Sequence, residues 1–146
     1  MAAGAPPVSV ILSSYNQPRA LRLVLEGFLA QSWRAFELIV ADDGSRRETF
    51  RLLERMKGRF SPALQVVTQE DRGFRKSRIL NRAAARSRGE LLVFCDGDCL
   101  PFPGHLAGYL QRWRPNAYLP GGEVPLDEGP SRSLPLPAVP LGLRAE

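Results

Sequence analysis

The stretch VSVILSSYNQP, residues 8–18, sets the pattern for the rest of the chain. Its first seven residues are mostly apolar and rich in β-branched side chains, which predicts a strand buried on both faces. A short polar turn then leads into Pro18, and proline suits the first turn of a helix. Apolar residues follow at helical spacing up to Leu29. The stretch therefore predicts a strand, a tight turn and a helix.

Further strands are predicted where short apolar runs recur, at FELIVA (36–41), LQVVTQ (64–69) and ELLVF (90–94). The residues between them favour helices, including one over residues 75–88 that is expected to end at Gly89. Nearly continuous apolar strands separated by helices indicate a parallel sheet with right-handed crossovers. The expected fold class is α/β, with a mostly parallel sheet and flanking helices.

The pattern weakens after residue 103. Leu106, Tyr109 and Trp113 are spaced as on one face of a helix, and YLPGGEV (118–124) is a candidate fifth strand. The sequence then becomes rich in proline and loses periodicity, which favours irregular structure. We therefore predict three segments. They are an N-terminal extension at 1–7, a folded domain at 8–119 and a Pro-rich tail or remnant at 120–146.

The composition is that of a soluble globular domain. The 146 residues are 44% hydrophobic and 24% charged. No apolar run approaches the roughly 18 residues that a membrane span requires. The first residues, MAAGAPP, lack the basic and apolar regions of a secretory signal, so a cytoplasmic location is expected. The net charge of +5 suits an anionic partner such as a nucleotide phosphate, nucleic acid or an acidic membrane face.

Acidic residues follow three of the four predicted strands, in ADDGS (41–45), QEDRGF (69–74) and CDGD (95–98). Ligands of open α/β sheets bind outside the carboxyl ends of the strands, so these segments should converge on one crevice. A buried strand that ends on carboxylates is costly unless they are paired, hydrogen-bonded or bound to a metal. Asp96 and Asp98 therefore predict a site for Mg²⁺ or Mn²⁺, which prefer carboxylate oxygens.

Other chemistries lack their motifs. The sequence has no G-x-G-x-x-G dinucleotide fingerprint, no G-x-x-x-x-G-K-[ST] phosphate loop and no G-x-S-x-G nucleophile. Cys95, Cys99 and His105 offer three zinc ligands at a spacing that matches no common structural site. Small packing residues are the simpler interpretation for both cysteines.

Five segments together resemble the nucleotide-binding half of a family 2 glycosyltransferase with the GT-A fold, which has a Rossmann-like sheet. The segments are VSVILSSYNQ (8–17), LAQSW (29–33), FELIVADDGS (36–45), EDRGFRKSRILNRA (70–83) and RGELLVFCDGDCLPFP (88–103). They follow the family's order and spacing. The last two are similar to those of bacterial transferases that build surface polysaccharide or lipopolysaccharide.

The resemblance implies a nucleotide-diphosphate sugar as the ligand, with a UDP-sugar first among the candidates. Ser13 and Tyr15 match the strand end that contacts the nucleotide, and Asp43 matches the residue that hydrogen-bonds the base. Arg75 and Lys76, at the start of the third helix, are expected to meet the diphosphate. Plainer interpretations stay open. ADDGS suits a turn and helix cap, and Tyr15 suits packing.

The resemblance also implies a metal cofactor, Mn²⁺ or Mg²⁺. Asp96 matches a contact to the ribose or the metal, and Asp98 matches the direct metal ligand. The implied reaction moves the sugar to a hydroxyl of a saccharide or lipid-linked acceptor, normally with inversion, in polysaccharide or glycolipid synthesis. No residue matches the general base, so the catalytic residue is unknown.

The Pro-rich end matches no part of the acceptor-binding half that family members usually carry. A truncated chain of low or no activity is therefore expected, and a catalytically incomplete nucleotide-binding remnant or module is the alternative. A third hypothesis is a nucleic-acid-binding module that uses the Arg-rich helix, but no aromatic residues interleave with its arginines. Nucleic acid is accordingly not an expected partner, whereas self-association and attachment to the cytoplasmic face of a membrane stay open.

Overall fold

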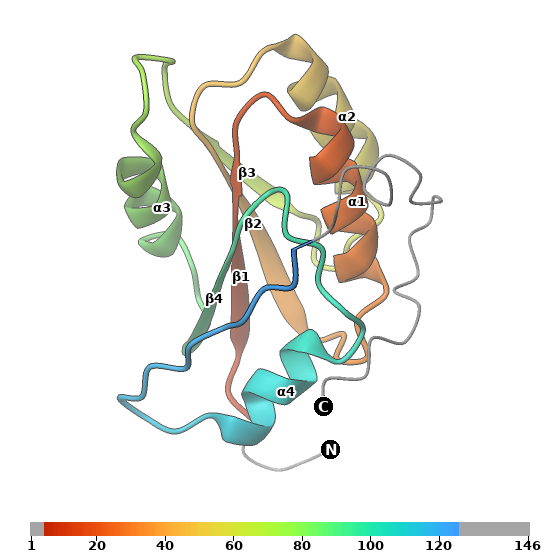
Figure 1. The fold of residues 1–146 in the computed structure, drawn as a ribbon, viewed down its shortest axis with the longest axis vertical. Coiled ribbons are helices and arrows are strands. Elements are labelled where there is room, and N and C mark those ends of the chain that lie inside the picture. The colour runs from red at the N-terminus through yellow and green to blue at the C-terminus, as the bar shows by residue number, and fades with distance from the viewer. Residues whose placement is uncertain (1–4, 126–146) are drawn as a thin grey trace.

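The computed structural model describes residues 5–125, which form a four-stranded sheet with helices on both faces (Figure 1). The strands are β1 (Val8–Ser14), β2 (Phe36–Asp42), β3 (Gln65–Thr68) and β4 (Leu91–Cys95). The helices are α1 (Pro18–Leu29), α2 (Arg47–Lys57), α3 (Lys76–Ala84) and α4 (His105–Arg112). Strands and helices alternate along the chain, as predicted.

The strand order is β3-β2-β1-β4, and every neighbouring pair is parallel. Val8 of β1 lies opposite Phe36 of β2 on one side and Leu91 of β4 on the other. The predicted α/β class with a parallel sheet and flanking helices is confirmed. From β1 the chain runs through α1 to β2 and on to β3, and it then crosses through α3 to β4 on the other side of β1. The strand order therefore reverses between β1 and β4, and this position is the topological switch point of the sheet.

β1 is buried along its whole length because both faces of the sheet are covered. Val8, Val10 and Leu12 contribute to a larger core with α1, α2 and α4. Ile11 belongs to a smaller core in which Ile79 of α3 packs. Figure 1 shows α3 on one side of the sheet and α1 and α2 on the other. Burial on both faces accounts for the continuous apolar run of this strand.

The helices are short and amphipathic. α1 begins at Pro18, whose fixed φ suits the first turn. Leu21, Leu25 and Phe28 are spaced along one face of α1 and are almost fully buried, each contributing about 1.5–3 kcal/mol by transfer from water. Among residues 5–125, no helix combines the length and apolar character that a membrane crossing requires.

The helix α3 ends at Ala84 rather than at Gly89, so the predicted boundary is wrong. The prediction extended the helix to residue 88, but the Arg88 backbone N–H donates at 2.6 Å to Oε1 of the buried Glu37 carboxylate, which also accepts from Ser9 Oγ at 2.5 Å. The Gly89 N–H in turn donates to Ser9 Oγ at 2.8 Å. These bonds hold residues 88–89 in a non-helical connection to β4.

The candidate fifth strand at 118–124 is also wrong, since no strand follows α4 within the described part of the chain. Pro120 has no N–H to donate to a neighbouring strand, and Gly121 and Gly122 have no side chains to pack. Tyr118 is 88% exposed, which agrees with an unpaired segment. The predicted tail from residue 126 lies outside the described residues.

The hydrogen bonds to Glu37 should make the free energy of unfolding depend on pH. Burial raises the pKa of Glu37, but hydrogen bonds from Ser9 and Arg88 outweigh burial and lower it below 4.5. The ionised carboxylate therefore stabilises the fold above the unfolded pKa, and this contribution is lost as the pH falls through the lower folded pKa. We predict that Glu37→Gln lowers the free energy of unfolding at pH 7 by about 1–3 kcal/mol.

Urea denaturation at pH 7 and pH 3 measures this effect. The deficit of Glu37→Gln relative to wild type should shrink between pH 7 and pH 3, because the contribution of the ionised carboxylate is lost as the pH falls through the lowered folded pKa. Glu54→Gln, on the exposed face of α2, removes the same charge without a buried contact and should change little at either pH. An equal deficit for Glu37→Gln at both pH values would contradict the role of the ionised carboxylate.

Candidate functional site

A crevice of about 330 Å³ lies at the carboxyl ends of β1 and β4, at the switch point of the sheet. It brings together six of the seven site residues expected from the sequence. They are Ser13, Tyr15, Asp43, Lys76, Asp96 and Asp98. These residues lie far apart in the sequence and meet because the parallel strands that precede them end at one edge of the sheet.

Asp43 is held as a fixed hydrogen-bond acceptor on the crevice wall. Its side chain is 5% exposed. Its Oδ1 accepts from Gln69 Nε2 at 2.6 Å, and its Oδ2 accepts from the backbone N–H of Arg75 at 2.8 Å. A carboxylate offers about four lone-pair sites, so acceptor capacity is left for a donor in the crevice.

The neighbouring Asp42 stabilises the turn formed by the ADDGS motif. Its Oδ1 accepts from the backbone N–H groups of Gly44 at 3.1 Å and Ser45 at 2.8 Å, which closes the turn after β2. Gly44 has φ +91°, and a Cβ there would meet the backbone of Asp71. The turn interpretation therefore describes Asp42, whereas Asp43 lines the crevice.

Asp96 and Asp98 lie on the loop that leaves β4. Asp96 Oδ1 accepts from Lys76 Nζ at 2.5 Å and from Ser13 Oγ at 3.1 Å. The hydrogen bond from Lys76 is the main cause of the lowered pKa of Asp96, so its carboxylate is ionised at neutral pH. Gly97 packs so tightly on β1 that a Cβ would overlap the carbonyl oxygen of Ser13. This contact fixes where the two carboxylates leave the sheet.

Two aromatic side chains lie at the rim of the crevice. Tyr15 is 48% exposed, and its hydroxyl donates to Asp71 Oδ2 at 3.1 Å. Phe74 is 87% exposed and follows Gly73, whose φ is +79°. The sequence pattern alone indicated no role for Phe74. The feature that could have identified it is an aromatic residue in a turn directly before a helix that begins at the crevice.

Arg75 is the predicted site residue that does not line the crevice. Its backbone N–H binds Asp43, but its guanidinium folds back and donates to the carbonyl oxygen of Glu70. Contact between the Arg75 side chain and a diphosphate stays a prediction. In this structure Arg75 serves the site through its backbone.

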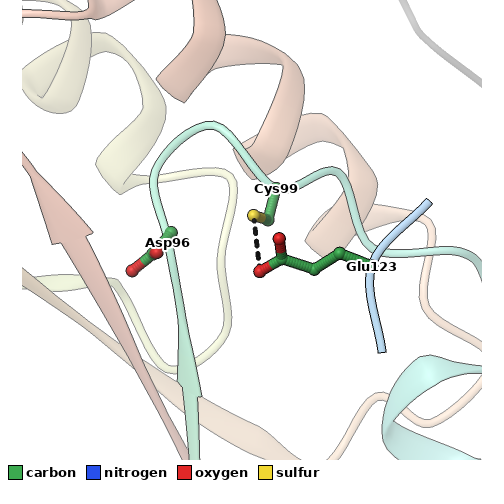
Figure 2. A group of neighbouring side chains, drawn as sticks. All are labelled: Asp96, Cys99 and Glu123. Carbon is green, nitrogen blue, oxygen red and sulfur yellow. Dashed lines mark hydrogen bonds between the residues drawn. The ribbon is translucent and has the colours of Figure 1, made fainter. Parts of the chain in front are cut away.

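Oxygen atoms dominate the potential metal ligands. Asp96, Cys99 and Glu123 place one ligand atom each within 4.8 Å of one another. Figure 2 shows the Glu123 carboxylate facing the Cys99 sulfur, which donates to Glu123 Oε1 at 3.5 Å. Burial and the adjacent Glu123 raise the pKa of Cys99 to about 12, so this sulfur stays a protonated thiol. Two of the three ligand atoms, from Asp96 and Glu123, are carboxylate oxygens, which Mg²⁺ and Mn²⁺ prefer, and Asp98 is not part of this group.

The zinc alternative finds no support in the described residues. The His105 ring packs edge-on against Phe102 and Tyr109, with ring centroids 5.7 Å and 5.1 Å away. Burial lowers the pKa of His105, as expected for a packed imidazole. His105 is not part of the group formed by Asp96, Cys99 and Glu123.

Gln31 fastens the segment after the Asp96 loop to the end of α1. Its side chain is 2% exposed. Nε2 donates to the carbonyl oxygens of Gly27 at 3.1 Å and Phe102 at 2.8 Å, and Oε1 accepts from the Leu106 N–H at 3.0 Å. These bonds hold residues 102–106, which follow the loop that carries Asp98. No local sequence pattern predicted this buried amide.

Comparison with known proteins places these features in a family. The model of the family described as "Glycosyl transferase family 2" matches residues 9–136. A putative glycosyltransferase of Bacillus subtilis, EpsE, is 32% identical over 139 residues, which cover 92% of this chain and 50% of EpsE. The O-antigen biosynthesis protein RfbC of Myxococcus xanthus is 38% identical over 97 residues, which cover 65% of this chain and 7% of RfbC. The chain thus spans about half the length of EpsE and much less of RfbC.

Solved structures agree on the GT-A fold. Residues 1–349 of TarS from Staphylococcus aureus superpose with a TM-score of 0.65 at 24% identity, covering 73% of this chain and 32% of that fragment. The mannosyltransferase PcManGT from Pyrobaculum calidifontis, solved with GDP-Man and Mn²⁺, gives a TM-score of 0.61 at 29% identity. That match covers 72% of this chain and 31% of PcManGT.

The contact between Gly97 and β1 can be tested by adding one methyl group. Gly97→Ala places its Cβ on the Ser13 carbonyl oxygen, so we predict a loss of about 1–3 kcal/mol in the free energy of unfolding. Gly108→Ala is the matched control because nothing lies within 4 Å of a Cβ there and the position is helical. The control should be stabilised by about 0.5–1 kcal/mol. Chemical denaturation of both variants checks these opposite signs, and equal effects would contradict the contact.

Proposed function

The chain belongs to glycosyl transferase family 2, and we propose that its crevice binds a nucleotide-diphosphate sugar together with Mn²⁺ or Mg²⁺. The sugar would be transferred to an acceptor hydroxyl in polysaccharide or glycolipid synthesis. The observation that carries this proposal is the convergence of Asp43, Lys76, Asp96 and Asp98 on one crevice at the switch point. Nucleotides bind at this position in open α/β sheets.

The base would bind beside Asp43. A carboxylate acceptor held in a fixed position suits the N–H donor on the edge of uracil or guanine, and such a bond is worth about 1.5–3 kcal/mol. Tyr15 and Phe74 offer exposed aromatic faces at the same rim, where a base can stack. We name a UDP-sugar first, following the uracil contact expected for Asp43. TarS, a structural neighbour, has been solved with UDP-GlcNAc.

The diphosphate and metal would bind beside the loop that leaves β4, which carries Asp96 and Asp98. Asp98, which is exposed, would ligate the metal directly, and Asp96 would contact the metal or the ribose. The metal supplies positive charge that stabilises the departing diphosphate. Lys76 would donate to phosphate oxygens, and the Ser13 hydroxyl, which donates to Asp96 Oδ1, would orient Asp96. The solved complex of PcManGT contains GDP-Man and Mn²⁺.

The general base of the transfer is not assigned. The three crevice carboxylates, Asp43, Asp96 and Asp98, all have roles in donor binding in this proposal. Because no further carboxylate is assigned to the acceptor, a nucleotide-binding module without turnover is the second candidate function. General-base assistance is typically worth about 10²–10⁴-fold in rate, so a chain without it would bind donor and transfer sugar very slowly.

The metal assignment is tested by Asp98→Asn. This change removes the charge and one ligand oxygen from an exposed side chain, so the fold should be unaffected. We predict that the increase in UDP affinity produced by Mn²⁺ is lost, as measured by calorimetric titration of UDP with Mn²⁺ and with EDTA. Glu90→Gln, at the other end of β4, removes the same charge and should keep the increase. Unchanged Mn²⁺-dependent affinity in Asp98→Asn would rule out Asp98 as the ligand.

A further inference from the structure

Lys76 is the one cationic side chain among the described residues that line the crevice. Its Nζ already contacts a carboxylate, since it lies 2.5 Å from Asp96 Oδ1. Ser13 Oγ donates to the same oxygen at 3.1 Å. The ammonium of Lys76 therefore neutralises the carboxylate that the proposed function assigns to the metal or the ribose.

This ion pair can exchange partners. The side chains of Lys76 and Asp96 are 33% and 46% exposed, and ion pairs that face water contribute little net stability. A lysine carries a compact charge on a flexible stem, so its ammonium can turn to another acceptor within reach. Lys76 is also the first residue of α3, and the N-terminus of a helix favours a nearby anion.

The electrostatic partners available to Asp96 and Lys76 change when nucleotide and cation bind. Asp43, Asp96 and Asp98 place three carboxylates near a single ammonium. A nucleotide diphosphate brings further negative charge, and a divalent cation offsets it at the carboxylates. With both bound, Asp96 no longer requires Lys76, and the phosphate oxygens offer this ammonium a charged partner.

We propose that Lys76 is a positioning residue that couples metal binding to nucleotide binding. In the free protein it holds Asp96 and competes with the cation. When a nucleotide diphosphate binds, Lys76 moves to the phosphate oxygens and releases Asp96. This inference rests on the proposed function. Because coupling is reciprocal, UDP raises the affinity for Mn²⁺ by the same factor by which Mn²⁺ raises the affinity for UDP.

The test compares wild type with Lys76→Met, which keeps an unbranched side chain and removes the charge. Free Mn²⁺ is measured by electron paramagnetic resonance without nucleotide, and UDP binding is measured by calorimetry in saturating Mn²⁺. Lys76→Met should bind Mn²⁺ alone more tightly, by about fivefold, because the competitor is gone. It should bind UDP more weakly, by about tenfold or more. Binding of uridine, which has no phosphate, should be unchanged.

Two further variants separate this role from a general change in charge. Lys76→Arg keeps a cation at Asp96 and should leave Mn²⁺ affinity near the wild-type value. Arg78→Met removes the same charge from an exposed position on α3 and should change either affinity by less than about twofold, since salt screens it. Thermal unfolding of each variant checks that the fold is retained.

The outcomes distinguish this inference from the proposed function. Tighter Mn²⁺ binding with weaker UDP binding in Lys76→Met supports the coupling role. Mn²⁺ affinity that is unchanged or lower in Lys76→Met overturns it, whatever UDP does. Wild-type protein that binds Mn²⁺ but not UDP would contradict the proposed function, and the Mn²⁺ comparison would still decide whether Lys76 competes. Absence of Mn²⁺ binding in every variant overturns both.

Discussion

The structure depends on β1, a strand with a hydrogen-bonded neighbour on each edge and a hydrophobic core on each face. Both faces of such a strand are buried only when helices cover both sides of a parallel sheet. The chain must then cross from the β3 edge to β4, which opens a crevice at the carboxyl end of β1, lined by Ser13 and Ser14. The position of the site is thus a consequence of how the central strand is buried.

The same arrangement explains how the crevice tolerates its negative charge. The carboxylates of Asp43 and Asp96 are each held by two hydrogen-bond donors that come from other parts of the chain. Asp43 accepts from Gln69 and from the first turn of the α3 region, and Asp96 accepts from β1 and from Lys76. Asp43, fixed in this way, needs no rearrangement to meet a nucleotide base, which lowers the cost of binding.

The sequence predicted those features that follow from local patterns. Continuous apolar runs located the four strands, and acidic residues at strand ends located the crevice. It failed where distant contacts decide the structure. Residues 88–89, which the predicted helix reached, are held instead by Glu37 and Ser9, far away in the sequence. The anchoring role of Gln31 also arises from tertiary contacts that carry no periodic signal.

The central claim, that the switch-point crevice holds the nucleotide and its metal, is tested most directly by paramagnetic broadening of amide NMR signals. Substoichiometric Mn²⁺ added with UDP should broaden first the signals of Ser13, Gly97 and Cys99, which surround the predicted metal position. Signals from α2 and from the amino ends of the strands should persist, because paramagnetic broadening falls steeply with distance. Broadening that begins elsewhere, or that affects all signals equally, would contradict the assignment of the site.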